Sequence, residues 1–152
     1  VLNNFQINSE KLGIFGHSMG GHGALVLYLK NPNLYKSVSA FAPICSPSNV
    51  PWGTKAFLTY LGDDKELWKE YDACELMKNS TEASSRPTIL IDQGLGDQFL
   101  EVQLQPEQFV AACEEVNQSV NLRRQEKYDH GYYFIQTFVS EHLHHHKEVL
   151  DG

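Results

Sequence analysis

The stretch Gly16-His17-Ser18-Met19-Gly20 decides the fold, because it matches the G-x-S-x-G pattern of a nucleophile elbow. It follows a short apolar run, residues 11–15, that predicts a buried strand, and it precedes residues 21–29, which have the composition of a helix. A strand, a sharp turn and a helix are the context in which this motif presents a nucleophilic serine. We expect both glycines to be needed, since a β-carbon at either position would crowd the turn. A glycine-rich turn that contains serine by chance is the alternative, and the flanking elements favour the catalytic interpretation.

Outward from the elbow, predicted strands alternate with predicted helices. The strands are residues 36–42, 87–92 and 120–126, and the helices are residues 55–61, 65–78, 107–117 and 132–149, with an irregular proline-rich loop at 43–54. Strand 87–92 is apolar on both faces, which predicts a central place in the sheet, whereas the more polar strand 120–126 is predicted nearer an edge. This alternation predicts an α/β fold with a mostly parallel sheet flanked by helices.

The composition excludes some classes of function. The chain has 152 residues, which suits one domain, and a net charge of −7 leaves no basic stripe for a nucleic-acid partner. No apolar run is long enough to cross a membrane, and no signal-peptide pattern opens the chain. The three cysteines, Cys45, Cys74 and Cys113, are odd in number and widely spaced, which favours reduced thiols and a cytoplasmic location. Glycosylation patterns at Asn79 and Asn117 are short enough to arise by chance.

The start of the chain suggests a fragment. Val1 is not an initiator methionine, and it stands a few residues before a strand that should need paired neighbours. We therefore expect residues 1–152 to form a single partial domain whose amino-terminal strands are absent.

A nucleophilic serine needs a base and a group that orients the base. In a parallel sheet these groups belong in loops beyond the carboxyl ends of strands. Asp97 follows strand 87–92, and His130 follows strand 120–126. The chain order Ser18, Asp97, His130 is the order typical of the α/β-hydrolase elbow. We predict these three as the catalytic residues.

Three other acidic residues lie near these loops and are alternatives to Asp97. Asp92, at the end of the same strand, is the remaining alternative for the orienting acid, and its side chain could instead enter the sheet or cap a turn. Asp129 adjoins His130 in one loop and should point away from it, and Glu101 is expected to be solvated.

The other histidines are predicted to be structural. His17 lies inside the turn and His22 one helical turn beyond the serine. His142, His145 and His146 share a face of the last predicted helix and could bind a metal. An exposed polar helix end, which also includes His144, is the preferred interpretation.

The tetrahedral intermediate needs two backbone N–H donors for its oxyanion. The elbow rule assigns one to Met19, next to the helix N-terminus. The second should come from a loop upstream of Val1.

Longer stretches resemble the S-formylglutathione hydrolase family, also called the esterase D family. They are Ile14-Phe15-Gly16-His17-Ser18-Met19-Gly20-Gly21-His22-Gly23-Ala24-Leu25, Ser37-Val38-Ser39-Ala40-Phe41-Ala42-Pro43-Ile44-Cys45, Pro51-Trp52-Gly53, Leu90-Ile91-Asp92-Gln93-Gly94, Asp97-Gln98-Phe99-Leu100 and Tyr128-Asp129-His130 with Tyr132-Tyr133-Phe134. The resemblance covers nearly the whole chain and corresponds to roughly the carboxyl-terminal half of that family's domain.

This resemblance implies an α/β-hydrolase fold and hydrolysis of the thioester S-formylglutathione to glutathione and formate. It implies no metal and no organic cofactor, a cytosolic role in formaldehyde detoxification, and often a homodimer. By position, Ser18 is the nucleophile, His130 the general base and then acid, Asp97 the orienting carboxylate, and Met19 an amide donor. Leu95-Gly96 and Gly131 depart slightly from the family pattern, which puts the substrate preference in question.

Three expectations remain to be tested. The missing upstream half implies that the chain alone should be inactive. Trp52 or Phe99 could narrow the acyl pocket, although ordinary packing is the preferred role for both. The rival functions are a general carboxylesterase of the same fold and a non-catalytic fragment.

Overall fold

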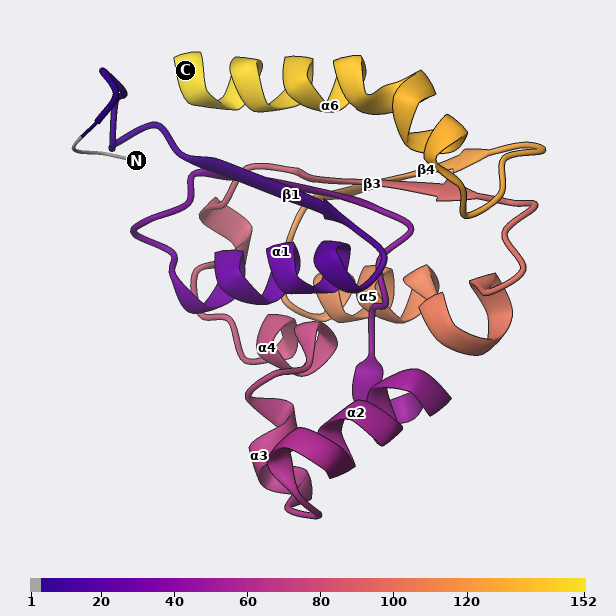
Figure 1. The fold of residues 1–152 in the computed structure, drawn as a ribbon. Coiled ribbons are helices and arrows are strands. Elements are labelled where there is room, and N and C mark those ends of the chain that lie inside the picture. Colours follow the sequence, from indigo (N-terminus) through magenta and orange to yellow (C-terminus); the bar gives the residue numbers. More distant parts are fainter. Residues whose placement is uncertain (1–3) are drawn as a thin grey trace.

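The computed structural model describes residues 4–152, and its centre is one parallel sheet of four strands (Figure 1). The strands lie in the order β1-β2-β3-β4, with bounds Gly13–His17, Ser37–Phe41, Ile89–Gly94 and Val120–Gln125. The pairing aligns Phe15 with Ser39, and Ile91 with Leu122. The α/β fold class predicted from the sequence is confirmed.

Helices cover both faces of the sheet. The long helix α6 (Tyr132–Asp151) lies on one face, and α1 (Met19–Lys30) and α5 (Pro106–Glu115) lie on the other (Figure 1). Helix α4 (Ala73–Lys78) packs on α1 and α5, and beyond it lie α2 (Pro51–Leu61) and α3 (Lys65–Lys69). Short helical turns occupy Pro47–Asn49, Ala83–Ser85 and Leu100–Leu104. All the strands are parallel, so their carboxyl ends meet at one edge, where the loops can share a site.

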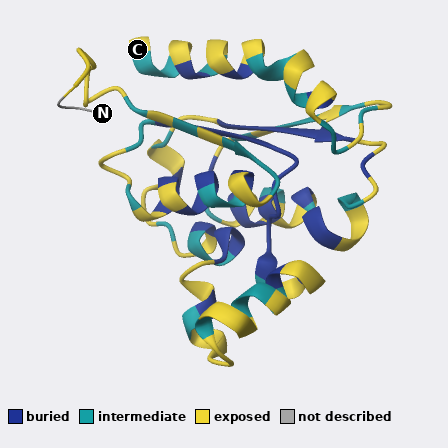
Figure 2. Cartoon of the chain, viewed as in Figure 1, coloured by how far each residue is buried: buried dark blue, intermediate teal, exposed yellow. Residues whose placement is uncertain are grey.

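The core is divided between the two sides of the sheet. On the α1 and α5 side, Leu25, Val38, Ile91 and Phe109 pack among other buried side chains. A second cluster around Phe41 includes Leu104 and Phe134, and the rings of Phe41 and Phe134 meet edge to face at 5.7 Å. Figure 2 shows this burial in the inner strands and on the facing sides of α1 and α5, while β1, α2 and α3 consist mostly of intermediate and exposed residues.

Two predicted helices have different bounds in the structure. The helix predicted at 55–61 begins at Pro51, because proline lacks an N–H and suits the first turn of a helix. The helix predicted at 65–78 is two helices, α3 and α4. Asp72 breaks it, because its carboxylate accepts hydrogen bonds from the N–H groups of Cys74 and Glu75 and so caps the start of α4.

The first strand also differs from its prediction. Residues 11–15 were predicted as a buried strand, but β1 covers 13–17 and lies at an edge of the sheet, where Phe15 is 45 % exposed. The predicted central position of strand 87–92 is confirmed for β3, and β4 lies at the other edge as predicted.

The cysteines and the helices bear on two earlier expectations. Cys45, Cys74 and Cys113 are all buried free thiols, and burial raises the pKa of Cys113 to about 12. Within residues 4–152, no helix combines the length and the apolar character that a membrane crossing requires.

Candidate active site

Ser18 occupies a strained turn between β1 and α1. Its φ of 57° and ψ of −117° lie outside the regions that serine prefers, at a cost of about 1–3 kcal/mol. The turn is held by the hydrogen bond from the Ser18 N–H to the Phe41 carbonyl, at 2.9 Å. Such strain persists only where the surrounding structure imposes it, and here it lifts the hydroxyl out of the strand.

The two glycines of the elbow are not equivalent. A β-carbon at Gly16 would lie 2.2 Å from the Gly20 carbonyl oxygen, so the expectation for Gly16 is confirmed. A β-carbon at Gly20 would meet nothing within 4 Å, so the same expectation for Gly20 is wrong. The reason is that Gly20 lies in the first turn of α1, where a side chain would project into open space.

The loops after β3 and β4 bring Asp97 and His130 to Ser18. The Ser18 Oγ lies 2.8 Å from the His130 Nε2, and the His130 Nδ1 lies 2.6 Å from the Asp97 Oδ2. Because a carboxylate only accepts hydrogen bonds, the proton resides on Nδ1, and Nε2 can accept from the serine hydroxyl. The arrangement can therefore transfer a proton from Ser18 to His130.

Three donors hold the Asp97 carboxylate. Besides His130, the Phe99 N–H donates to Oδ1 at 2.8 Å, and the Gln93 Nε2 donates to Oδ2 at 3.3 Å. Burial by itself would raise the pKa of Asp97, but the hydrogen bonds from His130 and Phe99 outweigh it and lower that pKa. Asp97 therefore remains charged at neutral pH. The sequence did not lead us to predict the contact with Gln93. The one available signal was the two-residue period of β3, which places Gln93 on the opposite face of the sheet from Asp92.

Aromatic rings enclose His130. The His17 ring lies 4.5 Å from the His130 ring, and Phe99 meets it edge-on at 5.1 Å. Trp52 packs on Phe99 at 4.6 Å and also lines the cavity beside Ser18, so the choice between a packing role and a pocket-narrowing role stays a prediction. The pKa of His17 is lowered by burial and by the neighbouring His130, which favours a neutral, structural ring as predicted.

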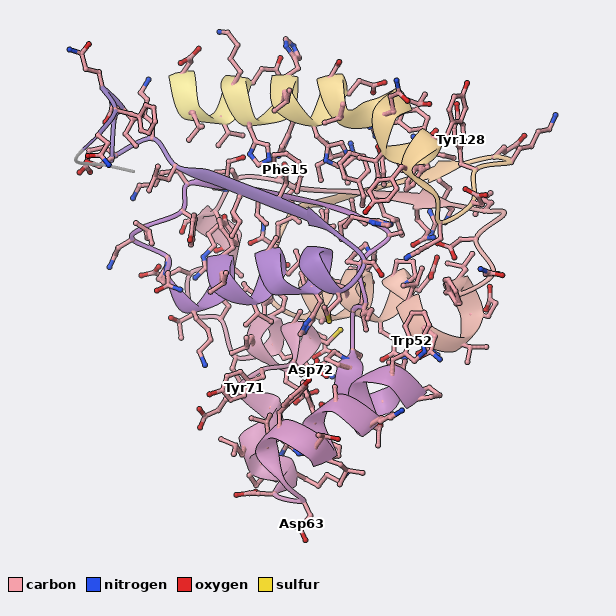
Figure 3. The ribbon with its side chains drawn as sticks, viewed as in Figure 1. Phe15, Trp52, Asp63, Tyr71, Asp72 and Tyr128 are labelled. Carbon is pink, nitrogen blue, oxygen red and sulfur yellow. The ribbon has the colours of Figure 1, made fainter. Side chains whose placement is uncertain are left out.

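A largely apolar cavity of about 450 Å³ adjoins Ser18. Trp52 and Tyr71, both labelled in Figure 3, line it together with Met19 and His22. Burial lowers the pKa of His22 to about 4, so this ring is uncharged at neutral pH. Met19 is the first residue of α1, and its N–H therefore has no acceptor within the helix and can serve an oxyanion.

Asp92, the alternative acid, belongs to a different cluster beneath α6. Its Oδ2 lies 3.1 Å from the His142 Nε2, and its Oδ1 lies 2.6 Å from the Arg123 Nε. The Ser39 hydroxyl lies 2.8 Å from the His142 Nδ1 and 2.9 Å from the His146 Nε2. The structure therefore pairs His130 with Asp97 and not with Asp92.

This cluster corrects the interpretation of the last helix as an exposed polar end. Only His144 is fully exposed, whereas His142 and His146 are buried and face the sheet. They turn inward because the polar Ser39 and Asp92 on the sheet give their nitrogens partners. Among the side chains of residues 4–152, no group of three or more His, Cys, Asp or Glu is arranged to hold a metal ion.

Comparison with known proteins gives consistent matches. The family model described as "Putative esterase" matches residues 1–145. The S-formylglutathione hydrolase of Rattus norvegicus is 54% identical over 150 residues, which cover 98% of this chain and 52% of that protein. The Arabidopsis thaliana S-formylglutathione hydrolase is 53% identical over 146 residues, which cover 96% of this chain and 51% of that protein.

A solved structure agrees with these relatives. The S-formylglutathione hydrolase from Agrobacterium tumefaciens superposes with a TM-score of 0.92 at 46% identity, covering 97% of this chain and 52% of that one. The chain thus spans about half the length of the relatives that it matches.

Proposed function

The chain belongs to the "Putative esterase" family, and from that premise we propose that it hydrolyses S-formylglutathione to glutathione and formate. The observation that carries the proposal is the unbroken hydrogen-bond relay from Ser18 through His130 to Asp97. Both distances lie within the reach that general-base catalysis requires. The substrate is proposed from the names of the relatives, and the type of reaction is proposed from the arrangement of Ser18, His130 and Asp97.

The proposed reaction proceeds in two steps. The Ser18 Oγ attacks the formyl carbon while His130 takes the hydroxyl proton, and the Met19 N–H stabilises the oxyanion. The carbon–sulfur bond then breaks, and glutathione leaves with the proton from His130, so that Ser18 carries a formyl ester. His130 next takes a proton from water, whose oxygen attacks the ester carbon. The bond between that carbon and the Ser18 Oγ then breaks, His130 returns the proton to Oγ, and the acid is released as formate and a proton. No metal or organic cofactor is required by this sequence of steps.

Asp97 contributes by holding the base. Its charge keeps the proton of the His130 ring on Nδ1 and stabilises the imidazolium that forms during attack. Since the Asp97 side chain is buried, this charge acts at short range and is little screened by water.

A general carboxylesterase is the second candidate, and the cavity favours it. A formyl group would fill little of the roughly 450 Å³ beside Ser18, whose lining is mostly apolar. Larger acyl esters would bury apolar surface there. A comparison of kcat/KM for S-formylglutathione with that for a series of p-nitrophenyl esters would rank the two substrate classes.

Reaction with a fluorophosphonate probe tests the nucleophile directly. Labelling of Ser18 in the 152-residue chain, with the Ser18→Ala variant unlabelled, would support the proposed nucleophile and would contradict the expectation that this chain alone is inactive. Loss of the thioester absorbance of S-formylglutathione then measures turnover. A folded chain that is neither labelled nor active would instead favour the third candidate, a non-catalytic polypeptide.

Location and assembly are part of the same proposal. A cytosolic enzyme is supported by the three free thiols. A homodimer is supported by the family resemblance alone, and sedimentation velocity at micromolar concentration would test it.

A further inference from the structure

Gln93 stands beside the catalytic relay without touching the substrate side. It is the fifth residue of β3, its side chain is 1 % exposed, and its amide nitrogen donates to the Asp97 Oδ2 and to the Gly94 carbonyl. Both neighbours are acceptors, so the NH₂ group must face them and the amide cannot be flipped.

The contact meets Asp97 at the atom that matters for catalysis. The His130 Nδ1 and the Gln93 Nε2 both donate to Oδ2, while the Phe99 N–H holds Oδ1. Oδ2 has two lone pairs, and the two donors together occupy them. With either donor missing, the carboxylate could rotate and exchange its oxygens.

Gln93 also leaves a polar atom unsatisfied. Its Oε1 is buried and has no hydrogen-bond partner among residues 4–152. A buried acceptor without a partner destabilises a fold, and an apolar side chain of the same length would avoid the loss. The stability of the fold therefore does not explain a glutamine at this position, whereas the hydrogen bond that orients Asp97 does.

Resting on the proposed function, we propose that Gln93 is a positioning residue that fixes the Asp97 carboxylate in the orientation that His130 requires. Its effect is on the rate of the chemical steps, not on substrate binding. Misplacement of a reacting group by about 1 Å can slow a reaction about 100-fold.

Gln118 provides a matched control. It is also a buried glutamine, at 4 % exposure, its amide donates to the Pro87 and Ser119 carbonyls, and its Oε1 also lacks a partner in the described residues. It lies just before β4, at the end of the strand remote from the loop of His130.

The test compares Gln93→Met with Gln118→Met in the 152-residue chain. We expect Gln93→Met to lower kcat and the rate of Ser18 labelling by about 10- to 100-fold with KM little changed. We expect Gln118→Met to leave both rates within twofold of the wild type. The melting temperatures of the two variants should agree within about 4 °C, because each loses the same kind of group.

Gln93→Glu adds a readout that a purely structural role would not move. A glutamic acid at this position can donate to Asp97 only while it is protonated, so its deficit relative to the wild type should grow as pH rises. The deficit of Gln93→Met should not depend on pH.

A titration of the Asp97 carboxyl by ¹³C NMR tests the role of Gln93 by a measurement that does not depend on enzyme activity. Loss of a donor should raise the pKa of Asp97 in Gln93→Met and leave it unchanged in Gln118→Met. An unmoved titration, or a Ser18 labelling rate within twofold of the wild type in Gln93→Met, would overturn the role of Gln93. Absence of labelling in the wild type would count against the proposed function, while the titration would still decide the role of Gln93.

Discussion

Residues 4–152 contain two hydrogen-bonded Ser–His–Asp arrangements, and of these two only the one at the elbow is open to a substrate. At the elbow, Ser18, His130 and Asp97 are linked at 2.8 and 2.6 Å, and beneath α6, Ser39, His142 and Asp92 are linked at 2.8 and 3.1 Å. By distance alone the two are nearly alike. Hydrogen-bond geometry is therefore not what distinguishes a candidate catalytic site from a structural network.

The two arrangements differ in their exposure to solvent and in the backbone conformation of the serine. The His130 side chain is 16 % exposed and lines one surface cavity, and Ser18 lines another, whereas Ser39, His142 and Asp92 are fully buried. Ser18 stands on a strained turn, while Ser39 lies within the regular strand β2.

The partners differ as well. The Ser39 hydroxyl forms hydrogen bonds with two buried histidines, His142 and His146, whereas the Ser18 hydroxyl forms one with His130. Arg123 neutralises Asp92, whereas the partners of Asp97 are His130, the Phe99 amide and Gln93. The buried cluster fastens α6 to the sheet, and the elbow cluster leaves a hydroxyl available.

The largest contrast is expected between the two serines. Ser18→Ala should abolish labelling and lower kcat by about 10⁴- to 10⁶-fold, because the nucleophile is lost. Ser39→Ala should keep labelling and lower the free energy of unfolding by about 1–3 kcal/mol, because two buried histidine nitrogens lose their partner. Labelling with the probe and urea unfolding measure the two effects. Loss of labelling in a folded Ser39→Ala protein would refute the distinction.

The two acids should differ next. Asp97→Asn is expected to lower kcat by about 10⁴-fold with little effect on folding, since an amide can no longer hold the correct form of the His130 ring. Asp92→Asn should instead lower the free energy of unfolding by about 1.5–3 kcal/mol, because it weakens the hydrogen bonds to Arg123, which keeps Glu141 as its second partner. Kinetics and chemical unfolding of both variants provide the check. Equal kinetic losses in the two variants would contradict this division of roles.

The two elbow glycines sharpen the contrast in backbone. Gly16→Ala should lower stability by about 2–4 kcal/mol and prevent labelling of Ser18, since the new β-carbon overlaps the Gly20 carbonyl. Gly20→Ala should be neutral or stabilise α1 by up to about 1 kcal/mol, because the site is open and alanine favours helix. Thermal unfolding of the pair would reveal the difference. Equal stabilities would show that the turn is not as tight as the structure indicates.

The smallest effect concerns the acid sensitivity of the buried cluster. Burial lowers the pKa of His146 from 6.5 to about 4, so the unfolded chain binds the proton more readily than the folded one. Stability from this group is therefore complete above pH 6.5 and is lost as pH falls toward 4, by about 2–3 kcal/mol. His146→Gln keeps a donor for Ser39 without titrating, and it should lose less stability between pH 7 and pH 4.5.

The exposed neighbour His144 is the control for this titration. His144→Gln should follow the wild type, because its side chain is 70 % exposed. Urea unfolding at pH 7 and at pH 4.5 measures how much free energy of unfolding each protein loses. An equal loss in His146→Gln and in the wild type would contradict the proposal that His146 causes this loss.

Much of the fold could be predicted from sequence because it rests on short-range patterns. The elbow motif with its flanking strand and helix, and the apolar run at 87–92, indicated a parallel α/β sheet. The resemblance to S-formylglutathione hydrolases is confirmed by relatives 54% and 53% identical. Pro51 and Asp72 showed the limit of pattern reading, because a helix start and a capping carboxylate changed the predicted bounds.

Three residues of the candidate site, in three separate loops, were predicted from the sequence. The contacts of the other acids and histidines were not. From the sequence, Asp97 was predicted as the orienting acid and Asp92 was kept as the alternative, since both lie near the end of one strand. The structure places Asp92 under α6 and Asp97 in the loop beyond. His142 and His146 were assigned to an exposed helix end because their partners, Ser39 and Asp92, lie on β2 and β3, between 50 and 107 residues earlier in the chain.

The sequence by itself predicted Ser18 as the nucleophile, because an elbow needs only adjacent residues, and it predicted the order Ser18, Asp97, His130 along parallel strands. Tertiary structure alone decided which acid meets which histidine and which serine stays within reach of solvent. Those outcomes depend on the face of the sheet that each side chain takes and on what packs over it, and such long-range contacts have no local sequence pattern.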